Sequence, residues 1–164
     1  MSDAVGGYPI LGLDCATRTG WAVAIVSNRM EAAGVWENPV TNAESPGAFM
    51  GHFAGWLHDL FCAYRPGTVY VERAHQRGRG ATEVGVGLFK RVQEFAYGFG
   101  ALCVPVPTGT LKKFATGNGR AGKNGMVAAM RKRWNLPGLV DDNEADALAL
   151  VAYGVAQMEE SEVA

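Results

Sequence analysis

The chain has 164 residues, which is enough for one domain with a buried core and excludes most multi-domain enzymes. Hydrophobic residues make up 48% of the chain and charged residues 19%, so a compact globule is expected and a disordered or fibrous protein is excluded. The formal net charge of -1, from 15 basic against 16 acidic residues, argues by itself against a nucleic-acid partner.

Three apolar segments open the chain and predict strands over residues 8–14, 21–26 and 31–37, with the first strand ending on Asp14. The turns between them are short and polar, which favours an antiparallel meander. The apolar spacing then changes to that of an amphipathic helix over about 48–63.

Residues 68–72 predict a buried strand that ends on Glu72 and leads into a polar loop. A helix over 81–99 and a strand over 101–106 follow, with Pro105 indicating an edge strand. Three further helices are predicted, over 108–115, 123–134 and 143–158.

These elements predict an α/β fold with a five-stranded mixed sheet, in which an antiparallel meander is followed by parallel strands and helices flank the sheet. We expect a single domain over residues 1–164, with a core over about 8–158 and a frayed acidic tail over 159–164. The N-terminal residues do not resemble a signal peptide, and no apolar run approaches the roughly 18 residues of a membrane span. The three cysteines are widely spaced, without a CxxC pair, so we expect a cytoplasmic protein with no membrane partner.

Carboxylates stand at three informative places. Asp14 and Glu72 each close an apolar strand, where a charge is costly without a partner, and Asp146 lies inside the Ala- and Leu-rich last helix. Ends of neighbouring strands lie about 5 Å apart, so two such carboxylates can converge on one hard cation. Asn143 precedes Asp146 by three residues and therefore shares its helical face.

Each acid also has a purely structural interpretation. Asp14 can bond the turn that follows its strand, and Glu72 can form a surface ion pair with Arg73 or Arg77. Asp141 and Glu144 fit a capping box at the start of the last helix. Taken together, acids at these places favour a metal site over independent coincidences.

Four sequence blocks, over residues 10–23, 69–72, 111–123 and 143–150, resemble RuvC-type Holliday junction resolvases in order and spacing. The resemblance covers about residues 9–155. It implies an RNase H-like fold and a homodimer that cuts two opposed strands of a four-way DNA junction. It also implies Mg²⁺ or Mn²⁺ as cofactor, with two ions in each active site.

The resemblance also assigns roles to residues. Asp14, Glu72 and Asp146 match acidic metal ligands of the family, and two lysines match those that help to hold DNA at the active site. Asn143 stands where relatives often have an acid or a histidine, so Asp142 or Glu144 could complete the site instead. The predicted catalytic residues are Asp14, Glu72, Asn143, Asp146, Lys112 and Lys123, and the predicted metal ligands are Asp14, Glu72, Asn143 and Asp146.

The near-neutral net charge hides a basic stretch, because residues 73–133 contain 12 of the 15 basic residues and only two acids. Within it, His75 lies in the loop where relatives often present an aromatic wedge, although a solvated loop histidine fits the sequence equally well. The glycine-rich turn 116–122 is flanked by cations and could approach a phosphate. The predicted DNA-binding residues are Arg73, His75, Arg77, Arg79, Lys113 and Arg120.

The sequence also suggests functions other than that of a resolvase. The Asp14–Gly20 segment also resembles the first phosphate loop of actin-like ATPases, but those enzymes need two such lobes and this chain has residues for one. A non-catalytic junction-binding module stays open because of Asn143. A broader branched-DNA or flap endonuclease of the same fold, of the kind found in phages, also stays open.

Overall fold

The computed structural model describes residues 8–25, 29–73 and 79–164, with the side chains of the helix over 79–99 described from residue 83 on. The described strands are β1 (Ile10–Asp14), β2 (Arg18–Ile25), β3 (Arg29–Glu37), β4 (Thr68–Arg73) and β5 (Leu102–Pro107). The described helices are α1 (Pro46–Tyr64), α2 (Arg79–Phe99), α3 (Thr108–Thr116), α4 (Lys123–Trp134) and α5 (Asp142–Val163).

The strands form one mixed sheet in the order β3-β2-β1-β4-β5. β1 pairs antiparallel with β2 and β2 antiparallel with β3, while β4 runs parallel to β1 and β5 parallel to β4. The predicted meander followed by parallel strands is therefore confirmed, and β5, which contains Pro105, is an edge strand as expected.

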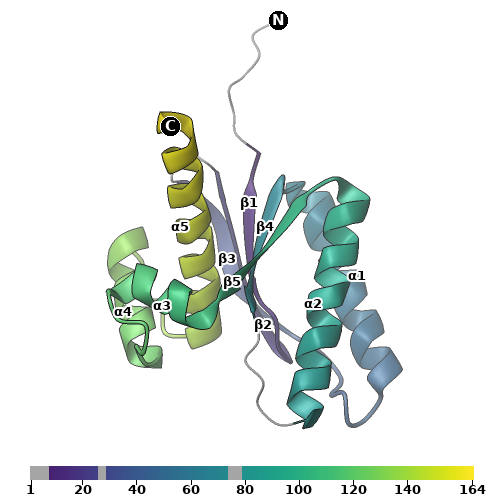
Figure 1. Cartoon of the computed structure of the whole chain (residues 1–164). Coiled ribbons are helices and arrows are strands. Elements are labelled where there is room, and N and C mark those ends of the chain that lie inside the picture. The colour runs from purple at the N-terminus through teal and green to yellow at the C-terminus, as the bar shows by residue number, and fades with distance from the viewer. Residues whose placement is uncertain (1–7, 26–28, 74–78) are drawn as a thin grey trace, which may run out of the picture.

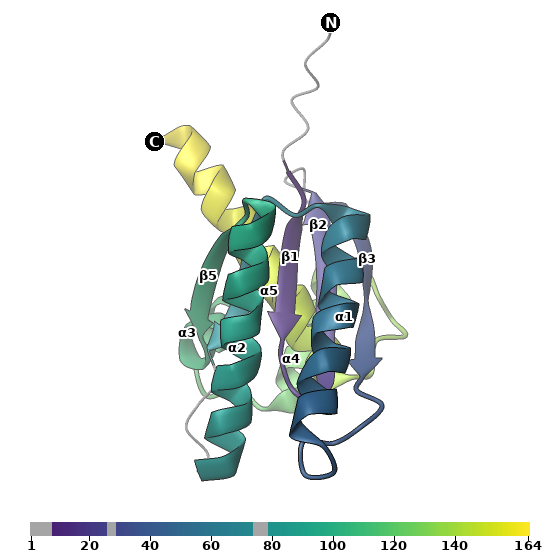
Figure 2. The same cartoon turned by 90° about the vertical axis from the view of Figure 1, so that its right-hand side faces the viewer.

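Helices cover both faces of the sheet. Figures 1 and 2 show α1 and α2 on one face and α3, α4 and α5 on the other. The alternation of side chains along β1 supplies both cores: Ile10 packs in the cluster that includes α5, and Leu11 and Leu13 pack in the cluster that includes α1 and α2. All three side chains are fully buried.

Helix α5 lies very close to the strands at the centre of the sheet. A Cβ atom added at Gly12 would lie 2.5 Å from the carbonyl oxygen of Ala147, and one added at Gly154 would lie 2.6 Å from the Tyr70 ring. The glycines on β1 and α5 thus allow backbone and ring to approach closely, which places α5 directly over β1 and β2.

Two element boundaries differ from the sequence-based prediction by more than two residues. β2 begins at Arg18 because the backbone of Arg18 and Thr19 already pairs with Glu37 and Trp36 of β3, which shortens the predicted turn. α5 continues past the predicted end at Met158 to Val163, since Glu residues support an exposed helical end. None of the helices in the described ranges is long and apolar enough to cross a membrane.

Candidate active site

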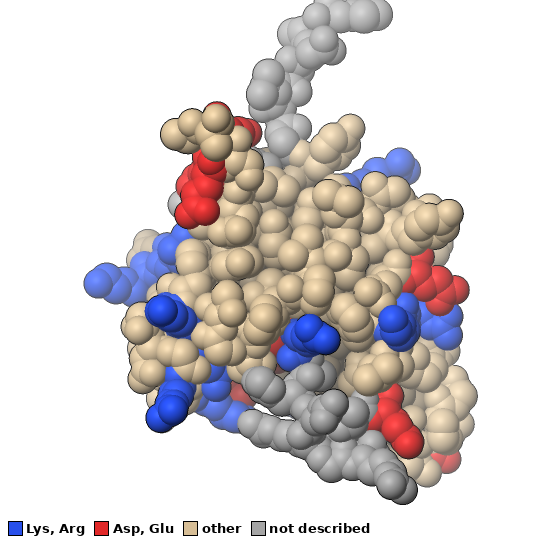
Figure 3. Space-filling view, viewed as in Figure 1, with Lys and Arg blue, Asp and Glu red and all other residues tan. Residues whose placement is uncertain are grey.

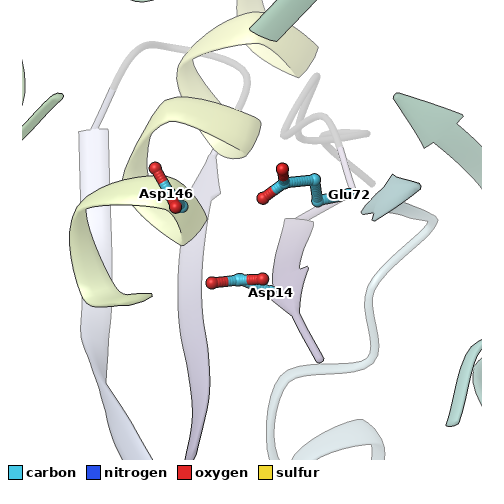
Figure 4. A group of neighbouring side chains, drawn as sticks. All are labelled: Asp14, Glu72 and Asp146. Carbon is cyan, nitrogen blue, oxygen red and sulfur yellow. The ribbon is translucent and has the colours of Figure 1, made fainter. Parts of the chain in front are cut away.

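Three carboxylates from distant parts of the chain meet where the strands β1 and β4 end. Asp14 ends β1, Glu72 lies near the end of β4, and Asp146 lies in the first turns of α5. Each offers one oxygen, and these three oxygens all lie within 4.8 Å of one another (Figure 4). The parallel pairing of β1 and β4 brings the two strand ends together, and the close packing of α5 supplies the third acid.

The three acids repel one another in a poorly solvated place. Burial raises the pKa of Asp14 well above its usual value, and the neighbouring charges of Glu72 and Asp146 add to the effect. Burial also raises the pKa of Asp146 to about 7, with contributions from Glu72 and Asp142. Without a cation the cluster is electrostatically unfavourable. A donor set made only of carboxylate oxygens suits a hard divalent cation, so the residues fit Mg²⁺ or Mn²⁺.

The three acids line a cleft of about 280 Å³. All six residues predicted to be catalytic line this cleft. Its lining is formed by Asp14, Cys15, Glu72, Thr108, Lys112, Lys123, Met126, Asp142, Asn143 and Asp146. The structure thus brings together residues that are up to 132 positions apart in the sequence, from Asp14 to Asp146.

Three residues stood as alternatives for completing the metal site. Asn143 and Asp142 both line the cleft, whereas Glu144 is absent from its described lining. The Asp142 carboxylate lies 2.8 Å from the Lys123 ammonium group, and this hydrogen bond lowers the pKa of Asp142. Because Asp142 is engaged by Lys123, Asn143 is the better placed of the two to offer an oxygen to a cation.

The start of α5 is held in place by its own cap and by β2. The Asp141 side chain accepts hydrogen bonds from the backbone N–H groups of Asn143 and Glu144, at 2.9 and 3.1 Å, as the capping interpretation predicted. Arg18, at the start of β2, donates to Asp141 at 2.8 Å and also to Glu37 at the end of β3. This bridge ties the helix that carries Asn143 and Asp146 to the meander.

The predicted DNA-binding residues are only partly described. Arg73, Lys113 and Arg120 are exposed, at the end of β4, on α3 and in the turn before α4. Figure 3 shows Lys and Arg side chains over the region where Figure 1 places α3 and α4, with a small patch of acidic atoms visible between them. His75 and Arg77 lie outside the described residues, and Arg79 begins α2 but its side chain lies outside the described part as well.

Some cations of the basic stretch have structural partners. Arg131 donates from Nε to the carbonyl oxygen of Leu139 at 2.5 Å. The Arg133 guanidinium lies 5.2 Å from the centre of the Phe114 ring. The charge of residues 73–133 therefore overstates the number of side chains available to phosphates.

Sequence reasoning missed three residues that line the cleft: Cys15, Thr108 and Met126. The Thr108 hydroxyl donates to Glu72 Oε1 at 2.6 Å. Burial and the charge of Asp14 raise the pKa of the Cys15 thiol, which favours its neutral form. Only Thr108 carried a usable signal, because it stands just after a predicted strand, as the sequence after Asp14 and Glu72 also does.

Comparisons with known proteins bear on the fold. No protein-family model matches the sequence, and a search of curated proteins gives no significant match. Among solved structures, Thermus thermophilus RuvC is 20% identical, with a TM-score of 0.75 over 92% of this chain and 96% of that one. The same protein in complex with a Holliday junction substrate is 19% identical, with a TM-score of 0.76 and coverages of 92% and 96%. The yeast mitochondrial Holliday junction resolvase Ydc2 is 14% identical, with a TM-score of 0.69 over 94% of this chain and 82% of that one.

These likenesses extend over nearly the whole chain and agree with the sheet order and the covering helices described above. They also agree with the four sequence blocks that carry the resemblance to RuvC-type proteins. The chain therefore has the RNase H-like fold of the RuvC-type Holliday junction resolvases.

Proposed function

We propose that this protein is a metal-dependent, structure-selective endodeoxyribonuclease that resolves four-way DNA junctions by paired phosphodiester hydrolysis. The observation that carries the proposal is the convergence of Asp14, Glu72 and Asp146 in one cleft, beside Lys112 and Lys123. This cleft belongs to a fold shared with a RuvC solved in complex with a Holliday junction substrate.

Within this proposal the residues of the cleft divide the work. Asp14, Glu72 and Asp146 hold Mg²⁺ or Mn²⁺, with the side-chain oxygen of Asn143 as an uncharged addition. Bound divalent cations, two in each site, supply the acidity that activates a water and stabilises the leaving oxygen. Lys112 and Lys123 line the same cleft and attract the scissile phosphate. No histidine is among the described lining residues, so we assign no general base to the side chains of the cleft.

The surface beside the cleft supports a branched-DNA substrate. Lys113, Arg120 and Arg73 are exposed. Lys113 follows the cleft residue Lys112 on α3, Arg120 lies in the turn that leads to the cleft residue Lys123, and Arg73 follows the cleft residue Glu72 at the end of β4. Cations in these separate segments can contact separate phosphates of a DNA backbone. We assign the DNA contacts of the cleft to these three side chains, together with the predicted contacts of His75, Arg77 and Arg79.

Paired cuts require two active sites, and we propose a homodimer. The described surface leaves large apolar side chains exposed on the outer side of α2, including Val86 at 50% and Tyr97 at 89% exposure. We propose that α2 contributes these side chains to the contact between the two chains. Sedimentation with junction DNA should show two chains per junction, and a strictly monomeric complex would favour the flap-nuclease alternative.

The experiment that tests the function incubates the protein with four-way, flap and linear duplex DNA of the same sequence, with Mg²⁺, with Mn²⁺ and with a chelator. The proposal predicts symmetric nicks in the four-way junction that need a divalent cation. Preferential cutting of flaps would instead identify a broader branched-DNA nuclease. Junction binding without any cutting would identify a non-catalytic binding module.

A further inference from the structure

The carboxylate of Glu72 differs from its two neighbours in how much it can move. A glutamate side chain turns about three bonds, whereas the aspartates Asp14 and Asp146 turn about two. Glu72 is half-buried and lines the cleft, and its carboxylate points toward the other two acids (Figure 4). A cation site built from these three residues therefore depends most on whatever restrains Glu72.

The hydroxyl of Thr108 provides such a restraint. Thr108 Oγ1 donates to Glu72 Oε1 at 2.6 Å in a half-buried place, across 36 positions of the sequence. A hydroxyl has a single proton, so the donor capacity of Thr108 is spent on this carboxylate. The bond occupies Oε1 and leaves Oε2 outside it. A hydrogen bond to an ionised acceptor is stronger than one between neutral groups.

Thr108 itself is held rigidly. It is the first residue of α3 and directly follows Pro107, which pairs in the sheet with Arg73, the residue after Glu72. One turn later, Leu111 is only 1% exposed and anchors α3 in the core. Threonine is also branched at Cβ, which limits its rotamers. The hydroxyl therefore has a fixed position relative to the end of β4.

The Thr108 hydroxyl is not the cap of its own helix. Thr108 is the first residue of α3, and the capping position before it is held by Pro107, which makes no side-chain capping bond. The proton of the Thr108 hydroxyl is directed to Glu72 in the cleft. This is the arrangement by which residues behind metal ligands orient them in known metal sites.

We propose that Thr108 is a positioning residue that fixes the Glu72 carboxylate for the divalent cation, an inference that rests on the proposed metal-dependent function. Removing the hydroxyl while keeping the shape of the side chain frees Glu72 to rotate. Loss of such a supporting hydrogen bond typically lowers metal affinity 10–100-fold. The effect therefore falls on cation binding and leaves junction binding unchanged.

The test is isothermal titration of the full chain with Mn²⁺, comparing wild type with Thr108→Val and Thr108→Ser. We expect a roughly 10–100-fold weaker Mn²⁺ affinity for Thr108→Val and near-wild-type affinity for Thr108→Ser. Thr110→Val is the matched control, because Thr110 is exposed on the same helix and does not line the cleft, and its affinity should not change.

The outcomes separate this inference from the proposed function. If wild type binds Mn²⁺ and cuts junctions while Thr108→Val binds Mn²⁺ equally well, Thr108 has no positioning role and the nuclease function stands. The same holds if Thr108→Val only lowers the unfolding temperature. If wild type binds no Mn²⁺, the metal-dependent function is overturned and the role of Thr108 with it.

Discussion

Gly20 of β2 lies directly against the backbone of Asn143 at the start of α5: a Cβ atom at position 20 would lie 1.9 Å from the Asn143 carbonyl oxygen. No side chain can occupy that space. The absence of a side chain on one strand thus determines how close the helix carrying Asn143 and Asp146 comes to the end of β1. The geometry of the candidate metal site depends on this contact.

We predict that Gly20→Ala displaces the start of α5, because the backbone carbonyl at the contact cannot move aside as a flexible side chain would. Unfolding in denaturant should show a loss of about 2–4 kcal/mol of stability. Mn²⁺ affinity should fall as well. Gly55→Ala is the control, since a Cβ at Gly55 meets nothing within 4 Å. Gly55 is exposed in the middle of α1, where alanine is a better helix former than glycine, so this variant should stabilise the protein by about 0.5–1 kcal/mol. Equal stability of the two variants would contradict the account.

The metal-free protein should lose stability as the pH rises from about 4 to about 7. The pKa of Asp146 is raised from 3.8 to about 7 in the folded chain, so between these values the folded state holds a proton that the unfolded state has released. The stability that this bound proton contributes is fully present below pH 3.8 and is lost as the pH passes 7. A pKa shift of this size corresponds to at most about 4 kcal/mol of folding stability. Asp14 acts in the same direction.

Denaturant unfolding with a chelator, at several pH values, measures this effect. Asp146→Asn should flatten the decline and make the metal-free protein more stable at pH 7. Saturating Mn²⁺ should increase the stability of the wild type at pH 7 but should not increase that of Asp146→Asn. A wild-type stability that stays constant between pH 4 and 7 would show that neither burial nor the neighbouring acids raise the pKa of Asp146.

Asn143→Asp should strengthen cation binding. It adds a fourth carboxylate to the proposed metal ligands Asp14, Glu72 and Asp146, and cation affinity rises with the number of charged ligands. We expect roughly tenfold tighter Mn²⁺ binding in calorimetry, and a lower stability without metal because of the added repulsion. An unchanged affinity would place Asn143 outside the metal site.

Removing Lys113 and Arg120 together should weaken junction binding at every sequence tested. Both are exposed and close in the chain to the cleft residues Lys112 and Lys123, and each phosphate contact adds about one to the slope of log affinity against log salt. The double alanine variant should reduce this slope by about two in fluorescence anisotropy titrations. Arg29→Ala is the control, because Arg29 lies at the opposite end of the sheet from Asp14. A slope that changes equally in both variants would remove α3 and its following turn from the interface.

Strong local patterns made much of this structure predictable. The strands that carry Asp14 and Glu72 at their ends follow from apolar runs that stop at an acid. The antiparallel meander followed by parallel strands follows from short turns and then helical crossovers. Asp146 could be placed beside them because it is an acid within a helix of otherwise small and apolar residues.

Other features depend on contacts that no local pattern encodes. The bond from Thr108 to Glu72 requires the register of β4 against β5, and the pairing of Lys123 with Asp142 requires the packing of α4 on α5. The early start of β2 at Arg18 depends on its partner strand. Contacts between distant parts of the chain determine all three features, and hydrophobic periodicity does not reveal such contacts.

The most direct test compares wild type with Asp14→Asn on a four-way junction in the presence of Mn²⁺. Each DNA strand is labelled in a separate reaction, so that the position of every cut can be mapped. We predict paired, symmetric cuts by wild type. For Asp14→Asn we predict a loss of at least roughly 1000-fold in cleavage rate with junction affinity retained, because Asp14 is one of the three acids proposed to hold the cation. Wild-type cleavage rates in Asp14→Asn would contradict the account, because the reaction would then not depend on the site formed by Asp14, Glu72 and Asp146.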